Sequence, residues 1–135
     1  GNRVQNALAT HFQNPSQRQI RTAISRYRQS RPRLELPHRM ICNTGDSAIC
    51  RGNTQGYAWP NTGPYIHLCP GAVQDGDQTA LTMIHEATHI GAGTDDHSYV
   101  WQNSYSNMSA AQAIDNADSY AFFAEAAEIE ITAIN

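Results

Sequence analysis

Apolar side chains recur at helical spacing in two stretches near the start of the chain. Residues 2–13 carry one on the same face about every four positions, and the pattern stops at Pro15. Ser16 can cap a second stretch of the same kind that runs to about Ser30, where the following Pro32 is expected to end it. The pattern therefore predicts two helices.

The middle of the chain alternates apolar and polar residues over short distances, which indicates strands. Residues 34–42 alternate, although Pro37 favours an edge strand or a bulge. Residues 57–59 and 65–68 are short strand-like runs joined by a turn rich in Pro and Gly. A small antiparallel sheet is expected.

Helical patterning returns in the second half. One helix is expected from Asp75 or Asp77 to about Gly91, and Ser109 can cap an alanine-rich helix over residues 110–131. The 135 residues are enough for one core and show no linker, so a single α+β domain over residues 1–135 is expected. It could be the mature or catalytic part of a longer precursor.

A metal-site pattern lies within the predicted helix that ends near Gly91. His85 and His89 are four residues apart, so both imidazoles lie on one helix face and can bind one metal ion. Glu86 follows the first histidine, where this pattern has the general base that acts on metal-bound water. The sequence therefore predicts a zinc centre with hydrolytic chemistry.

A catalytic zinc needs a third protein ligand, and the segment after the helix offers three. Gly91 and Gly93 would let the chain leave the helix and fold back, and Asp95, Asp96 and His97 follow within a few residues. Spacing alone does not choose among these three side chains.

A family resemblance distinguishes among these three candidate ligands. Residues 93–99 match the G-T-x-D-x-x-Y element that follows H-E-x-x-H in the aspzincins, and residues 116–123 look like their N-A-D-x-Y helix. The resemblance implies a zincin-like fold with Asp96 as the third zinc ligand and the phenol of Tyr99 directed into the site. It covers most of the chain from about Cys42 onward.

A metzincin interpretation stays open beside this one. It would make Asp95 the third ligand, but it places Ala92 where that motif has a glycine and leaves Met108 as the residue for a Met-turn.

The resemblance also bears on substrate preference. In lysine-specific aspzincins, two acids of the N-A-D helix hold the cationic side chain that follows the scissile bond. Asp118 keeps the first acid, whereas Ala121 stands at the second position. The resemblance therefore implies Asp118 as a substrate-binding residue and a preference for basic residues milder than strict lysine specificity.

Charge is unevenly distributed along the chain. The net charge is −3, so nucleic acid is not expected as a partner. Eight of the nine basic residues precede residue 40, whereas most acids lie in the half that carries the zinc motif. An acidic cleft would attract cationic substrates, although the same acids could simply form an acidic surface.

Three cysteines cluster in the central segment. The resemblance implies a disulfide between Cys50 and Cys69, and a Cys42–Cys50 bridge remains an alternative. A disulfide would fit a secreted, extracellular protein.

These observations predict a zinc endopeptidase in which Glu86 assists the attack of water on a peptide bond. One zinc ion, protein or peptide substrates, an inhibitor or pro-segment, a monomeric state and no membrane association are expected. A catalytic toxin or effector domain with a specific protein target, or a non-catalytic zinc-binding module, are the alternatives.

Overall fold

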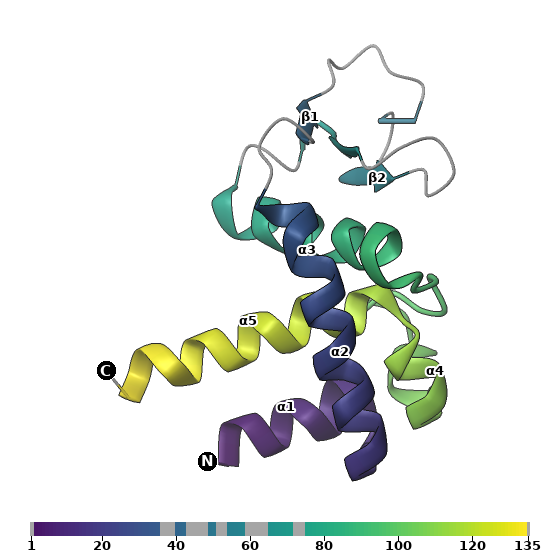
Figure 1. The fold of residues 1–135 in the computed structure, drawn as a ribbon, viewed down its shortest axis with the longest axis vertical. Helices are drawn as coiled ribbons and strands as arrows, with labels where there is room; N and C mark the ends of the chain where they lie inside the picture. Colours follow the sequence, from purple (N-terminus) through teal and green to yellow (C-terminus); the bar gives the residue numbers. More distant parts are fainter. Residues whose placement is uncertain are drawn as a thin grey trace.

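A computed structural model describes residues 2–35, 40–42, 49–50, 54–58, 65–71 and 75–134. Two helices pack against a central helix, and a small sheet covers that helix on one side (Figure 1). In chain order the elements are α1 (Asn2–Phe12), α2 (Gln17–Leu34), β1 (Met40–Cys42), β2 (Gly56–Ala58), β3 (Ile66–Leu68), α3 (Gly76–Ala92), the 3-10 turn η3 (Tyr105–Asn107), α4 (Ala110–Ile114) and α5 (Ala117–Ile134).

Both predicted N-terminal helices are present, and α2 is longer than expected. Ser16 caps α2 through a reciprocal capping box with Gln19. The helix continues through Pro32 to Leu34, so the expected stop at Pro32 is wrong. The ring removes a donor for the carbonyl of Arg28, but both residues are exposed, and water can satisfy that oxygen.

The sheet has the strand order β1-β3-β2. Strands β2 and β3 are antiparallel, as expected, while β1 pairs with β3 in parallel. Of the predicted strand over residues 34–42, the described residues Met40–Cys42 form β1, whereas Leu34 belongs to α2. Residues 36–39 and Trp59 lie outside the described part of the chain.

The predicted C-terminal helix is interrupted after Ile114. Asp115 ends α4, and the next residue, Asn116, bonds to the backbone of a distant loop instead of continuing the helix. Its side-chain oxygen accepts from the amide of Ser98 at 3.0 Å, and its amide donates to the Ser98 carbonyl at 2.9 Å. Asn116 is fully buried, so this pair of bonds fixes the loop to the start of α5.

Helix α3 lies at the centre of the packing. It contacts α2, α5 and strands β2 and β3. Gly91 lies inside α3, where an added Cβ would be 2.6 Å from the carbonyl oxygen of Gln29 in α2. Gly91 thus allows the two helices to pack closely. The helix ends at Ala92, close to the expected end at about Gly91, and Gly93 supplies the turn that follows.

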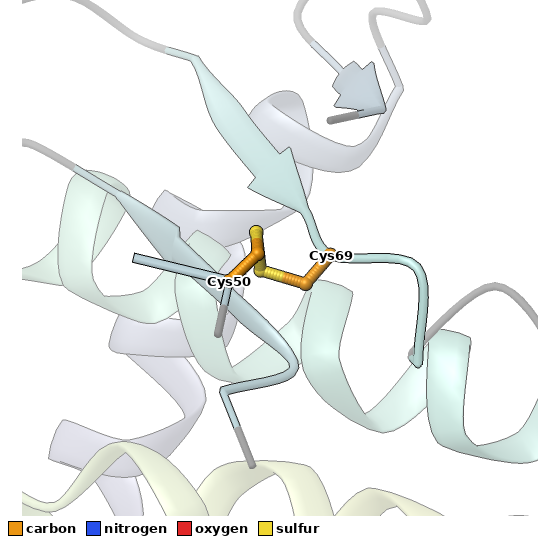
Figure 2. The surroundings of a disulfide bond; sticks show 2 residues. All are labelled: Cys50 and Cys69. Carbon is orange, nitrogen blue, oxygen red and sulfur yellow. A yellow bond between two sulfur atoms is a disulfide. The ribbon is translucent and has the colours of Figure 1, made fainter. Parts of the chain in front are cut away.

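The structure contains the Cys50–Cys69 disulfide, with a Cα–Cα distance of 5.3 Å. Cys69 directly follows β3, and Figure 2 shows the bridge joining it to the short segment that carries Cys50. The amide of Cys69 also donates to the carbonyl of Gln55, just before β2, at 2.8 Å. The disulfide therefore holds this segment against the sheet that covers α3.

Candidate metal centre

The caps of α3 determine where its two histidines lie. Asp75 caps the N-terminus by accepting from the amides of Asp77 and Gln78. At the other end Gly93 takes a left-handed conformation, with φ of 68°. The chain therefore turns back after one αL residue, and the segment that follows returns past the histidine face of the helix.

Three side-chain atoms converge on one point. Asp96 Oδ1 lies 3.0 Å from His85 Nε2 and 3.1 Å from His89 Nε2, and the two Nε2 atoms are 3.1 Å apart. Asp95 and His97, the other two candidates, instead group with Asp115 in an exposed cluster. The fold thus brings Asp96 to the histidines and directs its neighbours away from them.

The hydrogen bond made by Nδ1 of each imidazole determines whether its Nε2 can act as a metal ligand. His85 Nδ1 donates to Asp118 Oδ1 at 2.7 Å, and His89 Nδ1 donates to the Thr94 carbonyl at 2.6 Å. With Nδ1 protonated, each neutral ring presents an Nε2 lone pair to the centre. Two lone pairs and a carboxylate facing one another repel, so positive charge at the centre, from a proton on an imidazole or from a metal ion, stabilises the arrangement. This donor set fits zinc.

The pKa values of the three groups lead to the same conclusion. Burial opposes the charged form of both imidazoles, but bonds to Asp118 and Asp96 raise the pKa of His85 to about 10, and the bond to Asp96 raises that of His89. Burial also opposes charge on Asp96, yet the two histidines hold the pKa of that carboxyl well below its usual range. The cluster therefore favours positive charge between a permanent carboxylate and two imidazoles.

Glu86 lies beside the cluster without joining it. Its carboxylate oxygen is 3.9 Å from His85 Nε2, and the residue is 6% exposed. Burial raises the pKa of Glu86 above its ordinary value, although the nearby histidines lower it. A carboxylate with a raised pKa next to a cation site can accept and return a proton.

Tyr99 and Trp101 form one wall of the site. The Tyr99 ring lies parallel to that of His85 with centroids 6.0 Å apart, and Trp101 stacks on Tyr99 at 4.7 Å. Burial and then the negative charge of Asp96 raise the pKa of Tyr99 to about 12. The phenol therefore carries its proton at neutral pH and acts as a hydrogen-bond donor, in this structure toward Asp96.

A cleft of about 570 Å³ opens beside these residues. Gly56 of the edge strand β2 borders it, and a Cβ there would be 2.6 Å from Thr82 of α3, so the strand lies directly on the helix. The remaining lining is mostly uncharged: Thr54, Gln55, Gln78, Leu81, Thr82, Val100, Trp101 and Phe122 accompany His85, Glu86, Tyr99 and Asp118.

Two contributors to the site were not predicted as such from the sequence. Thr94 supplies the carbonyl that orients His89, and its hydroxyl donates to Thr88 at 2.9 Å. Asp118 was expected at the substrate, whereas the structure places its carboxylate on His85. The position of Thr94 directly after the αL glycine is the one signal that could have indicated its contact with the helix end.

Comparison with known proteins identifies the family of this chain. The family model described as lysine-specific metallo-endopeptidase, Aspzincin M35, matches residues 2–125. A peptidyl-Lys metalloendopeptidase of Pleurotus ostreatus is 38% identical over 91 residues, which cover 61% of this chain and 54% of that protein. A neutral protease 2 homologue of Aspergillus fumigatus is 36% identical over 94 residues, covering 60% of this chain and 25% of that protein. The chain thus matches about half or less of the length of these curated relatives.

Among solved structures, a zinc peptidase from Grifola frondosa superposes with a TM-score of 0.69 at 21% identity, over 90% of this chain and 77% of that one. This likeness confirms the predicted α+β zincin-like fold.

Proposed function

The chain belongs to the aspzincin family of metallo-endopeptidases, as predicted, and we propose that it hydrolyses internal peptide bonds with one zinc ion. His85, His89 and Asp96 would hold the ion, and Glu86 and Tyr99 would act on the substrate. The main support for this proposal is that His85 Nε2, His89 Nε2 and Asp96 Oδ1 lie 3.0–3.1 Å from one another. Glu86 lies beside them in an open cleft.

The chemistry divides between the metal and two side chains. Zinc supplies a Lewis acid that activates water and polarises the scissile carbonyl. Glu86 accepts the proton of the attacking water and passes it to the leaving amine, for which its buried position and raised pKa are suited. Tyr99 donates its phenolic proton in a hydrogen bond to the oxygen that becomes negative.

The substrate is an extended protein or peptide segment. Strand β2 is the edge of the sheet and borders the cleft, so a substrate backbone can pair with it. Such pairing presents one peptide bond after another to Glu86 without regard to sequence, and side-chain preference must come from the rest of the lining. The sequence-based preference for basic residues depended on Asp118, whose carboxylate accepts a hydrogen bond from His85 in this structure.

The biological setting is also part of the proposal. The Cys50–Cys69 disulfide supports a secreted, extracellular enzyme, because such bonds persist in oxidising surroundings. Among the helices the structure describes, none is both long and apolar enough to cross a bilayer. We keep the expectations of a monomer and of a proteinaceous inhibitor or pro-segment as predictions.

Cleavage of a random peptide library by the purified protein tests the proposal. We expect internal cleavage that stops when the metal is chelated and returns when zinc is added back. Added magnesium should not restore it, because the nitrogen donors favour zinc. A protein that binds zinc but cleaves no internal bond in the library would contradict the peptidase assignment.

A further inference from the structure

Asp118 is surrounded by protein groups, although it borders the cleft. It lies in the first turn of α5 and is 6% exposed. Its Oδ1 accepts from His85 Nδ1 at 2.7 Å, and its Oδ2 accepts from the amide of Val100 at 2.9 Å. Each carboxylate oxygen thus already has a strong donor.

These two bonds join three parts of the molecule. One reaches from α5 to the first histidine of α3, 33 residues earlier in the sequence. The other reaches the backbone between Tyr99 and Trp101, whose stacked rings form a wall of the cleft. A change at Asp118 would therefore move both the proposed metal ligand and the wall.

A substrate cation would have to approach an oxygen of Asp118 that already accepts one hydrogen bond. An ammonium group that approached from the cleft would need to displace His85 Nδ1 or the Val100 amide, or share an oxygen with one of them. Among the described residues that line the cleft, the other carboxylate belongs to Glu86. Ala121, one helical turn after Asp118, offers no second acid.

We propose that Asp118 is a positioning residue for His85 and the Tyr99–Trp101 wall, and that it does not anchor a basic substrate side chain. The carboxylate fixes the ring orientation of His85 and keeps the proton on Nδ1, so that Nε2 faces the metal. The cleft consequently has no dedicated acid for lysine and accepts an uncharged side chain beside the scissile bond as readily as a basic one. The role in metal binding can be tested separately from the proposed peptidase activity.

Zinc affinity of Asp118→Asn provides the first test. We expect a 10- to 100-fold loss relative to the unchanged protein, measured by competition with a chromogenic chelator. Asp115→Asn is the matched control, since Asp115 bonds to Arg26 and His97 instead of a proposed ligand. It should keep zinc affinity within about twofold. Unchanged affinity in a folded Asp118→Asn protein would overturn the positioning role.

Kinetics on paired peptides provide the second test. Within a pair, the two peptides are identical except that one carries lysine where the other carries norleucine. In one pair this residue precedes the cleaved bond, and in a second pair it follows the bond. We expect kcat/KM of zinc-loaded Asp118→Asn to fall by the same factor for both. A KM increase confined to the lysine peptide, with zinc affinity kept, would identify Asp118 as a substrate anchor.

The unaltered protein gives a third readout that does not depend on folding of a variant. It should cleave lysine and norleucine peptides within about threefold of each other. A lysine preference above tenfold would overturn the inference. If neither peptide is cleaved, the peptidase proposal fails, while the zinc affinities still decide the role of Asp118.

Discussion

At the scale of single residues, the centre depends on hydrogen bonds that determine which ring nitrogen is free. Asp118 and the carbonyl of Thr94 hold the Nδ1 protons of the two histidines, and both Nε2 atoms therefore face Asp96. His85, Glu86 and His89 could be predicted from sequence because helical spacing alone determines their relative positions. The approach of Asp118 could not, since 33 residues of folded chain separate it from His85.

Asp96 and Asp95 provide a comparison between neighbouring carboxylates. Asp96→Ala should greatly reduce zinc content and abolish peptidase activity, because it removes one of three proposed ligands. Asp95→Ala should retain zinc and most activity, since Asp95 lies outside the histidine cluster. Metal content after gel filtration, measured with activity, checks both variants. The reverse ranking would favour the metzincin register.

Tyr99 tests the assignment of the hydrogen-bond donor. Tyr99→Phe keeps the ring that packs between His85 and Trp101 but removes the phenolic proton. We expect kcat to fall by about 10²–10³-fold, as for the loss of an oxyanion donor, with zinc content unchanged. Steady-state kinetics and metal analysis on the same preparation measure both. A structural tyrosine would instead lower thermal stability and leave kcat unaltered.

At the scale of elements, the site depends on where helices end and how closely they pack. Capping residues were recognisable. Ser16 caps α2, Asp75, one of the two expected starts, caps α3, and Ser109 caps α4, the first part of its expected helix. The break between α4 and α5 could not be recognised from the sequence, because it comes from hydrogen bonds between Asn116 and a loop 18 residues earlier. Local pattern gave the alanine-rich helix, and tertiary contacts determined where it divides.

Gly91 is the residue at which this close packing is most directly testable. Gly91→Ala would place a Cβ 2.6 Å from the Gln29 carbonyl oxygen and 2.7 Å from the Ser30 Cα, so α2 would have to move. We expect a loss of about 1–3 kcal/mol in the free energy of unfolding, despite the better helix propensity of alanine.

Gly76→Ala is the matched control at the other end of α3. Among the described residues, apart from its chain neighbours and the backbone of its own helix, no atom lies within 4 Å of the added Cβ, so stability should be unchanged or slightly higher. Urea unfolding of both variants measures the difference. Equal stability of the two would contradict the close contact between α2 and α3.

At the scale of the whole molecule, the fold assembles a polar cluster from two consecutive segments and a third segment that lies later in the chain. Helix α3 gives the histidines and Glu86, the loop after it gives Asp96 and Tyr99, and α5 gives Asp118. The α+β zincin-like fold could be predicted because the H-E-x-x-H helix and the family motifs cover much of the chain. The parallel pairing of β1 with β3 could not, because short strands carry no signal for their partner.

The division of labour between metal ligands and Glu86 is the central claim, and Glu86→Gln tests it most directly. The variant should bind zinc with the stoichiometry and affinity of the unchanged protein, because the glutamate is not among the three converging atoms. Its peptidase kcat should fall by several orders of magnitude, about 10³-fold or more, since the amide cannot accept the proton. Zinc titration and peptide cleavage on one folded preparation give both quantities. A variant that keeps near-normal kcat, or that loses its zinc, would contradict the account.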